Sequence, residues 1–170
     1  LLSGYAIIYT GLNTMTFFYL ISSLVIIISS WYSINYDKGN KWLAPLFASS
    51  ILGVIIILLS YNSLQFLAGW EIMSLSGYVM IGLHSKKANH AFLFSAFSEI
   101  STVFLVAGMV YSYIFTGTFN FVPIPNTIPL ILVSVGFFIK MGLLPFMIAD
   151  WEPLAVYSSP SNAAAIFSAL

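Results

Sequence analysis

The sequence predicts an all-α, polytopic membrane protein with about five transmembrane helices and the start of a sixth. Of its 170 residues, 60% are hydrophobic and only 6% are charged, whereas a soluble domain carries about 25% charged residues. Apolar segments of about 20 residues, the length that crosses a bilayer, recur along the chain. The lysines between these segments fall in alternate loops, as expected when cytoplasmic loops carry the positive charge.

The expected spans follow one another in order, and each is bounded by polar, aromatic or proline-containing residues. The second and third are separated only by Tyr-Asn-Ser, so they are expected to form an antiparallel hairpin. The uncharged segment 116–127 contains two prolines and is expected to be a surface loop. Residues 1–11 are too short to span and are expected at the membrane surface. The spans are about 13–34, 43–61, 63–83, 90–115 and 127–148, and the next helix is expected to start near Ser161.

The loop charges predict an orientation. Lys38 and Lys41 lie between the first two spans, and Lys86 and Lys87 lie between the third and fourth. Two spans separate these loops, so both emerge on the same side, which is the cytoplasmic side or its organellar equivalent. The chain is therefore expected to be a multi-pass protein of a prokaryotic cell membrane or the mitochondrial inner membrane.

Composition also excludes several classes of function. The chain has no cysteine, which excludes disulfides, iron–sulfur clusters and thiolate metal sites within it. It has no basic face for nucleic acid, since five lysines balance five acids. His84 and His90 have the wrong spacing for a helical metal pair and no evident third ligand. They are solvated loop residues or, alternatively, part of a proton entry. We expect no cofactor and no metal.

Lys140 and Glu71 are the most informative residues, because both lie inside apolar segments. A charge at the centre of a membrane helix costs about 3 kcal/mol even on insertion scales, so such residues usually have a partner and a function. Moving or protonating the carboxylate would change the proton affinity of a nearby amine. The pair therefore predicts proton handling, although the sequence does not show that the two residues meet.

Polar stripes accompany both acidic spans. Glu71, Ser74 and Tyr78 share one helical face, either as a structural carboxylate with a neighbouring hydroxyl or as a titratable group beside an internal path. The fourth span carries a second stripe, in which Glu99 and Ser98 are candidate relay groups or packing residues. Ser74 is a third candidate relay. The second stripe comprises Ser95, Ser98, Glu99 and Thr102.

Lys140 is expected beside a break in its helix. Gly136 precedes it by one turn, and Pro145 follows five residues later and removes a backbone donor. Discontinuous membrane helices usually line a cavity, because the freed carbonyls need polar partners. The alternative is a lysine that extends to the interface. Asp150 and Glu152 follow, either as acids at a hydrated entrance or as ordinary loop charges.

Three ordered segments resemble the antiporter-like subunits of respiratory complex I. Residues 67–78 resemble their Trp-Glu-x-x-Ser-Leu-x-Ser-Tyr helix, and residues 136–146 resemble their Gly-x-x-x-Lys-x-Gly-x-x-Pro-x-His discontinuous helix. Residues 159–168 resemble the Ala-Pro-Ser-x-x-Ser-Ala-Leu start of the next helix. The loop 116–121 also fits. The same family includes membrane subunits of formate hydrogenlyase, membrane-bound hydrogenases and Mrp cation/proton antiporters.

The resemblance implies that Lys140 is the central proton carrier and Glu71 its partner carboxylate. It implies a fragment of one proton-translocating domain, in the first of two inverted helix repeats. The partners would be other membrane subunits of a redox assembly, the lipid bilayer and protons, with no redox chemistry in this chain. Its first residue is leucine and its last residues are apolar, so we expect a piece of a longer polypeptide.

The sequence departs from the family pattern after the broken helix. Phe146 and Met147 follow the proline where the family usually has a histidine, and the family's Leu-Pro-Asp/Glu-Ala-His loop is replaced. The divergence favours a hydrogenase-type or otherwise specialised relative. Two alternatives to a proton-translocating subunit remain: a Mrp-type antiporter that exchanges Na⁺ for protons, and a scaffold that only anchors partners.

Overall fold

The computed structural model describes residues 14–36, 41–85, 88–123, 126–143, 151–161 and 163–164. Over these ranges the chain forms helices and no strand, which confirms the all-α fold class. The expected surface segment 1–11 lies outside the described residues, as do Lys38, Lys86 and Lys87. The helices are α2 (Thr14–Tyr36), α3 (Leu43–Leu59), α4 (Ser63–His84), α5 (Ala88–Thr116), α6 (Thr127–Lys140) and α7 (Trp151–Ser158).

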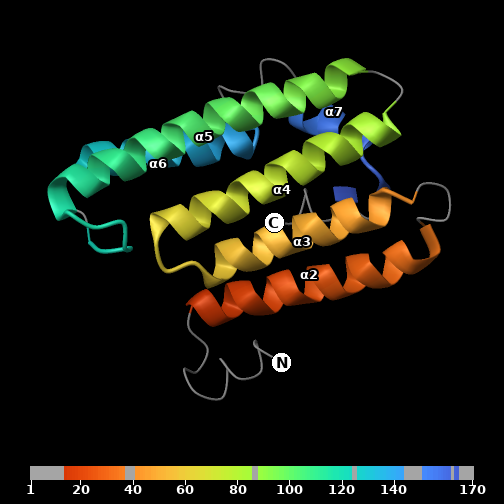
Figure 1. The fold of residues 1–170 in the computed structure, drawn as a ribbon, viewed down its shortest axis with the longest axis horizontal. Coiled ribbons are helices and arrows are strands. Elements are labelled where there is room, and N and C mark those ends of the chain that lie inside the picture. The colour runs from red at the N-terminus through yellow and green to blue at the C-terminus, as the bar shows by residue number, and fades with distance from the viewer. Residues whose placement is uncertain are drawn as a thin grey trace.

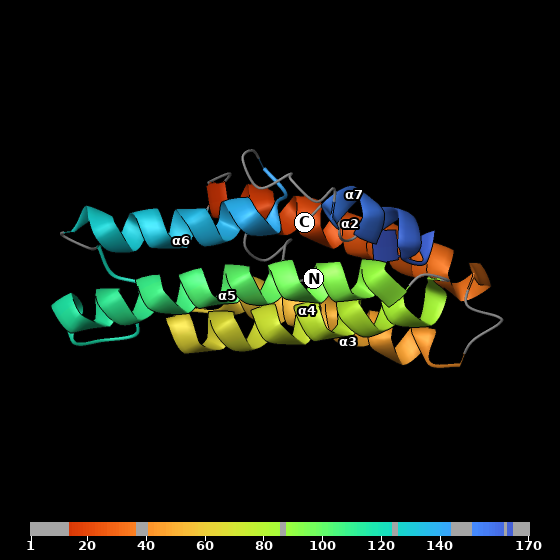
Figure 2. The ribbon, with the colours of Figure 1, turned by 90° about the horizontal axis from the view of Figure 1, so that it is seen from above.

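The helices lie in two layers. α3, α4 and α5 run side by side in one layer (Figure 1), and α2, α6 and α7 lie on one side of it (Figure 2). The most extensive contacts join α3 to α4 and α5 to α6, and α5 also packs against α4. Two antiparallel hairpins, α3–α4 and α5–α6, therefore meet along the line between α4 and α5.

Within the described residues, three helices, α2, α4 and α5, contain apolar stretches long enough to cross a membrane. α3 and α6 are equally apolar but shorter, at 17 and 14 residues. At 1.5 Å per residue, α6 is about 21 Å long, less than the roughly 30 Å hydrocarbon core of a bilayer. These apolar helices make the chain an integral, multi-pass membrane protein.

Two loops pair at one end of the bundle. Asn62 forms an isolated antiparallel bridge with Asn120, in which the Ser63 amide donates to the Phe119 carbonyl at 2.8 Å. Asn62 also caps α4, since its side chain accepts from the Gln65 amide. The hairpin turn and the loop after α5 therefore lie on the same side of the bundle, as the alternation of spans predicts.

Small residues allow α3 and α4 to approach closely. A Cβ atom on Gly69 would lie 2.7 Å from the Gly53 carbonyl oxygen and 2.9 Å from the Ile57 backbone nitrogen. About two turns further along α4, Ser76 Oγ donates to Ser49 Oγ at 3.0 Å. Close backbone approach of this kind is how helices associate in lipid, where burial of apolar surface gives little driving force.

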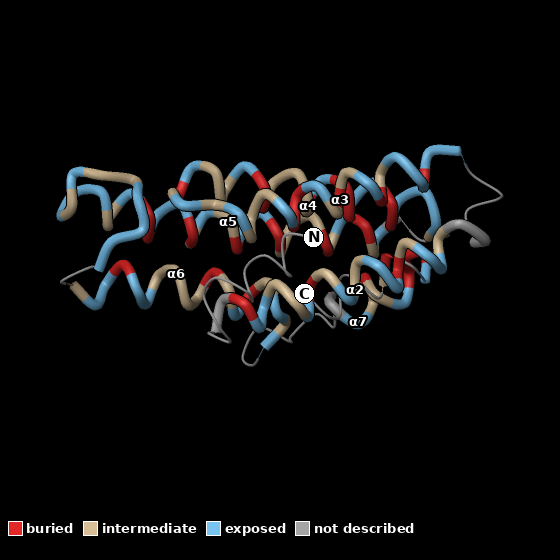
Figure 3. Tube along the Cα trace, turned by 90° about the horizontal axis from the view of Figure 1, so that it is seen from below, coloured by how far each residue is buried: buried red, intermediate tan, exposed pale blue. Residues whose placement is uncertain are grey.

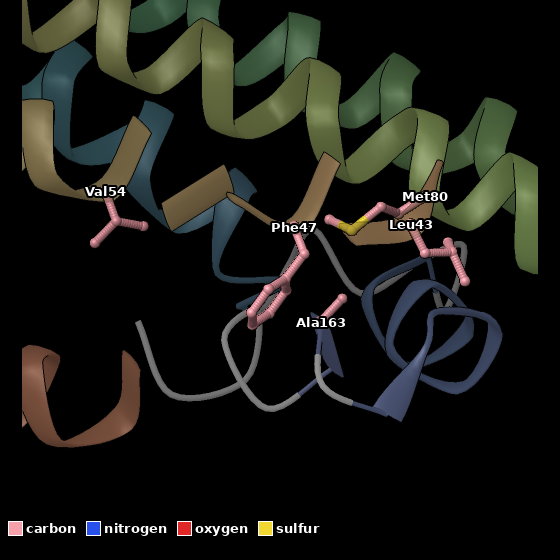
Figure 4. Close-up of a cluster of buried hydrophobic side chains, with 5 residues drawn as sticks. All are labelled: Leu43, Phe47, Val54, Met80 and Ala163. Atoms are coloured by element: carbon pink, nitrogen blue, oxygen red, sulfur yellow. The ribbon is translucent and has the colours of Figure 1, made fainter. Parts of the chain in front are cut away.

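Buried side chains gather between the layers. In Figure 3 the buried positions of α3, α4 and α5 turn towards the opposite layer. One cluster joins Leu43, Phe47 and Val54 of α3 to Met80 of α4 and to Ala163 (Figure 4). Since Ala163 is fully buried, this cluster ties a distant segment of the chain onto the α3–α4 hairpin.

Two elements differ from the sequence prediction. The span expected over 127–148 is helical only to Lys140, and the residues 144–150 lie outside the described part. Residues 151–158, expected as a loop, form the helix α7, which packs against α5. Glu152 therefore lies in a helix and not in a loop, whereas Asp150 lies outside the described residues. Helical backbone resumes at Ser161, where the next helix was expected.

Candidate functional site

Lys140 is the last residue of α6, and the residues that follow it form a regular C-terminal capping motif. Gly142 adopts a left-handed conformation with φ of 62°, and its amide bonds to the Ile139 carbonyl. The Leu143 amide reaches back to the Phe138 carbonyl at 3.0 Å. These two bonds form the Schellman motif, in which glycine ends a helix and satisfies its last carbonyls. The helix break therefore lies at Gly142, before the proline that the sequence analysis held responsible.

The Lys140 amine is held by hydroxyl groups from two other helices. Its Nζ donates to Ser74 Oγ of α4 and to Ser98 Oγ of α5, each at 2.8 Å. Both serines are buried, at 4% and 2% exposure. The position at the C-terminal end of α6 also favours a cation, because the helix dipole is negative there. Three helices thus converge on one amine.

Aromatic rings surround the same amine. Nζ lies 5.3 Å from the centroid of the Trp70 ring and 5.0 Å from that of Phe94. Trp70 is itself packed edge-on against Phe137 of α6. A cation over an aromatic face gains about 0.5–2 kcal/mol, more when water is excluded. Among the described residues, the amine is therefore flanked by aromatic rings and hydrogen-bonded to two hydroxyl groups.

Glu71 lies near Lys140 without touching it. Its Oε1 accepts from Thr102 Oγ1 of α5 at 2.8 Å, and no ion pair joins Glu71 to Lys140, although both residues are described. Ser74, which accepts from the Lys140 amine, lies three residues after Glu71 on α4, so the carboxylate and the amine lie near each other. Glu71 and Lys140 are each half-buried. A buried Glu/Lys ion pair is therefore not shown: both residues are half-buried, and the carboxylate and the amine bond to different hydroxyl groups.

The other candidate relays divide between the interior and the surface. Ser74 and Ser98 lie inside and contact the amine. Glu99 is exposed on α5, and no hydrogen bond joins it to another described residue. Tyr78, expected on the same polar face as Glu71, is 40% exposed. Only some residues of each polar stripe therefore face the helix junction.

The α5–α6 contact positions Lys140. Ser101 Oγ donates to the Gly136 carbonyl at 2.8 Å in a fully buried setting. A Cβ on Gly136 would lie 2.9 Å from Leu105 Cγ and 3.0 Å from the Ser101 carbonyl oxygen. Gly136 thus lets α5 approach the turn that precedes Lys140.

The histidines do not join this junction. His84 is exposed, whereas His90 is half-buried and its Nδ1 forms a short hydrogen bond with Ser158 Oγ at the end of α7. The description of His90 as a solvated loop residue is therefore wrong. In the described part of the chain, no group of three His, Cys, Asp or Glu side chains could hold a metal ion.

Sequence reasoning missed four participants. Thr102 was placed on a polar stripe but not linked to Glu71, because i, i+4 spacing gives the shared face and not the partner across a helix junction. Trp70 and Phe94 look like ordinary apolar residues. Gly142 carried a usable signal: glycine shortly before a proline is a typical helix end.

The chain matches a known family model over residues 60–170, described as "NADH:quinone oxidoreductase/Mrp antiporter, TM". The chain belongs to this family. The match covers α4 to α7, and so includes every residue of the junction described above.

Curated relatives agree with the family. The chain is 30% identical to NADH-quinone oxidoreductase subunit N of Pelobacter propionicus, over 75% of this chain and 29% of that protein. It is 30% identical to subunit N of Trichlorobacter lovleyi, over 89% of this chain and 34% of that protein. With subunit L of Buchnera aphidicola the identity is 35%, over 59% of this chain and 17% of the relative. The chain spans about a third of the relatives' length or less. None of these names mentions a hydrogenase, so that narrower expectation stays a prediction.

Proposed function

We propose that this chain is part of a proton-translocating membrane subunit of a complex I-like assembly of the NADH:quinone oxidoreductase type. Lys140 is the proton carrier and Glu71 its partner carboxylate. The observation that carries the proposal is the convergence of α4, α5 and α6 on a single amine. Ser74 and Ser98 hold this amine, near a carboxylate that accepts from Thr102 and forms no ion pair with the lysine. The redox chemistry belongs to other subunits of the assembly.

The hydroxyl groups suit an amine that gains and loses a proton. A protonated lysine has three donors and no acceptor, so both serine oxygens accept from it. A neutral amine has a lone pair, to which a serine hydroxyl can turn and donate. Ser74 and Ser98 can therefore satisfy both protonation states without moving a helix. A carboxylate in direct contact would favour only the charged state.

The helix break supports the same proposal. The Schellman end of α6 makes Lys140 the last residue of a helix of 14 residues, which is shorter than a full membrane span. Helices that end part-way across the membrane in transporters usually lie beside a substrate or ion site. The partners we propose are the other membrane subunits of the assembly, the lipid bilayer and protons. The names of the relatives support the first of these, since each is called a subunit of NADH-quinone oxidoreductase.

The decisive experiment replaces Lys140 with arginine in the full-length protein within its complete assembly. Arginine keeps the positive charge and the donors but does not release a proton in proteins. In lipid vesicles, K140R is expected to lower redox-driven proton uptake at least about 100-fold, the lower end of what a positioned proton-transfer group contributes. Lys41, an exposed loop lysine, gives the matched control, K41R, which should translocate normally. Normal uptake by K140R, with the assembly intact, would make Lys140 a structural cation.

A second candidate function is Na⁺/H⁺ exchange, which the family description favours because it names Mrp antiporters beside the oxidoreductases. The two candidates differ in what drives the protons. An antiporter would move protons in vesicles in response to a sodium gradient without any electron donor. A redox-driven subunit would move them only while electrons flow.

A further inference from the structure

One turn of α5 lies between the two charges of the site. Ser98 and Thr102 are four residues apart, so their side chains stack on one face of the helix. Ser98 Oγ accepts from Lys140 and Thr102 Oγ1 donates to Glu71. The carboxylate and the amine are therefore bonded to two different hydroxyl groups, which lie one turn apart on the same face of α5.

Thr102 has two acceptors for one proton. Its Oγ1 lies 2.8 Å from Glu71 Oε1 and 3.1 Å from the carbonyl oxygen of Ser98. A threonine hydroxyl carries a single hydrogen and can donate to only one of them at a time. The carboxylate is the stronger acceptor, because hydrogen bonds to an ionised group are shorter and stronger. The carbonyl offers a second bond that leaves no buried donor unpaired.

The first position keeps the charges apart. While Thr102 donates to Glu71, the carboxylate is tied to α5 and makes no contact ion pair with Lys140. A contact pair in a low-dielectric interior binds far more strongly than the same pair in water, because attraction varies inversely with distance and dielectric constant. Such a pair would retain the proton on the lysine. Separation by hydroxyl groups weakens that retention.

We propose that the Thr102 hydroxyl is a two-position latch for Glu71: it holds the carboxylate away from Lys140 in one position and releases it towards the amine in the other. In the released position the hydroxyl donates to the Ser98 carbonyl, on the residue that holds the amine. Thr102 keeps its own proton throughout, so it is a positioning residue and not a proton carrier. This inference rests on the proton-carrier function of Lys140 proposed above.

Two substitutions of Thr102 separate a latch from a packing role. Valine keeps the shape of threonine without the hydroxyl, whereas serine keeps the hydroxyl without the methyl group. In the complete assembly in vesicles, T102V is expected to lower proton uptake about tenfold, the effect of losing one hydrogen bond to a charged group. T102S is expected to stay within about twofold of the wild type. A packing role predicts the opposite order and would overturn the latch.

Thr116 provides a control on the same helix. Its Oγ1 also donates back to a carbonyl four residues earlier, that of Ser112 at 3.0 Å, but it lies at the end of α5, away from both charges. T116V should therefore translocate protons normally. A loss in T116V equal to that in T102V would show a general effect of removing helix hydroxyls, which contradicts the latch.

A combined variant tests whether Thr102 acts through the carboxylate. When Glu71 is first replaced by alanine, adding T102V should cause no further loss, because the latch has nothing to hold. Independent losses would contradict the proposal. An experimental structure of T102V should show Glu71 and Lys140 within 4 Å of each other, and an unchanged separation would also overturn it. If K140R translocates normally, the proposed function fails; if K140R fails but T102V translocates normally, only the latch fails.

Discussion

The two faces of α4 make different kinds of contact. Towards α3, α4 presents Gly69 and Ser76, which bring two backbones together and bond hydroxyl to hydroxyl. Towards α5 and α6 it presents Glu71 and Ser74, whose partners are a threonine and a lysine. The first interface contains neutral groups with little room to rearrange. The second contains charges separated by hydroxyls that can change partners. A rigid contact on one side of a helix allows an adjustable one on the other.

The largest expected effect comes from adding a side chain at the rigid contact between α4 and α3. G69L places a side chain where even a Cβ atom would lie 2.7 Å from the Gly53 carbonyl oxygen, so α3 and α4 must separate. We expect loss of the assembled protein from the membrane, measured by its abundance after detergent extraction and native gel separation. Gly82 lies on the same helix with only Ala91 Cβ within reach, at 3.8 Å. G82A should assemble normally, and equal loss in both variants would contradict the comparison.

A smaller effect is expected on the adjustable face. S98A removes a buried acceptor of the Lys140 amine but leaves the Ser74 hydroxyl in place. Losing one hydrogen bond to a charged group corresponds to about a tenfold lower rate of proton uptake in vesicles. The assembled protein should remain as abundant as the wild type. S95A is the matched control, since Ser95 lies one turn earlier on α5 and does not contact the amine. Unchanged uptake in S98A would show that the hydroxyl is dispensable.

The smallest effect is expected from a hydroxyl on the rigid face. S76A removes the bond from Ser76 Oγ to Ser49 Oγ, and such a bond between helices in a membrane is worth about 0.6–2 kcal/mol. The thermal unfolding midpoint of the purified assembly should fall by a few degrees, whereas the rate of proton uptake stays unchanged. The contrast with S98A sharpens the comparison, because both substitutions delete one buried hydroxyl. A clear loss of uptake in S76A would show that the two faces are not independent.

The sequence predicted the membrane fold because that fold depends on composition and length. Charges are rare, and apolar segments near spanning length alternate with polar or aromatic boundaries. The unusual residues Glu71 and Lys140 stood out for the same reason: a charge in an apolar segment is costly wherever its helix packs. Their placement at one helix junction was not predictable from spacing, since they lie on separate helices.

The sequence predictions that differ from the structure concern single segments or residues, and each difference has its own cause. The end of α6 was expected about eight residues late, because hydropathy continues through Leu143 and beyond while the backbone turns at Gly142. α7 was missed because eight residues with a proline in the first turn do not resemble a span. His90 was assigned to solvent because its partner Ser158 lies in that missed helix. The inverted repeat implied by the family resemblance stays a prediction.

By itself the sequence determined that this is a multi-pass helical membrane protein, that it belongs to a family of transmembrane subunits, and which ionisable residues are costly. Transfer of side chains from water to lipid sets these features one segment at a time. Only the tertiary structure decided that Thr102 holds Glu71, that two serines hold Lys140, and that the charges stay apart. Those contacts depend on how α4, α5 and α6 rotate and approach one another, and close packing at small residues such as Gly136 sets that arrangement.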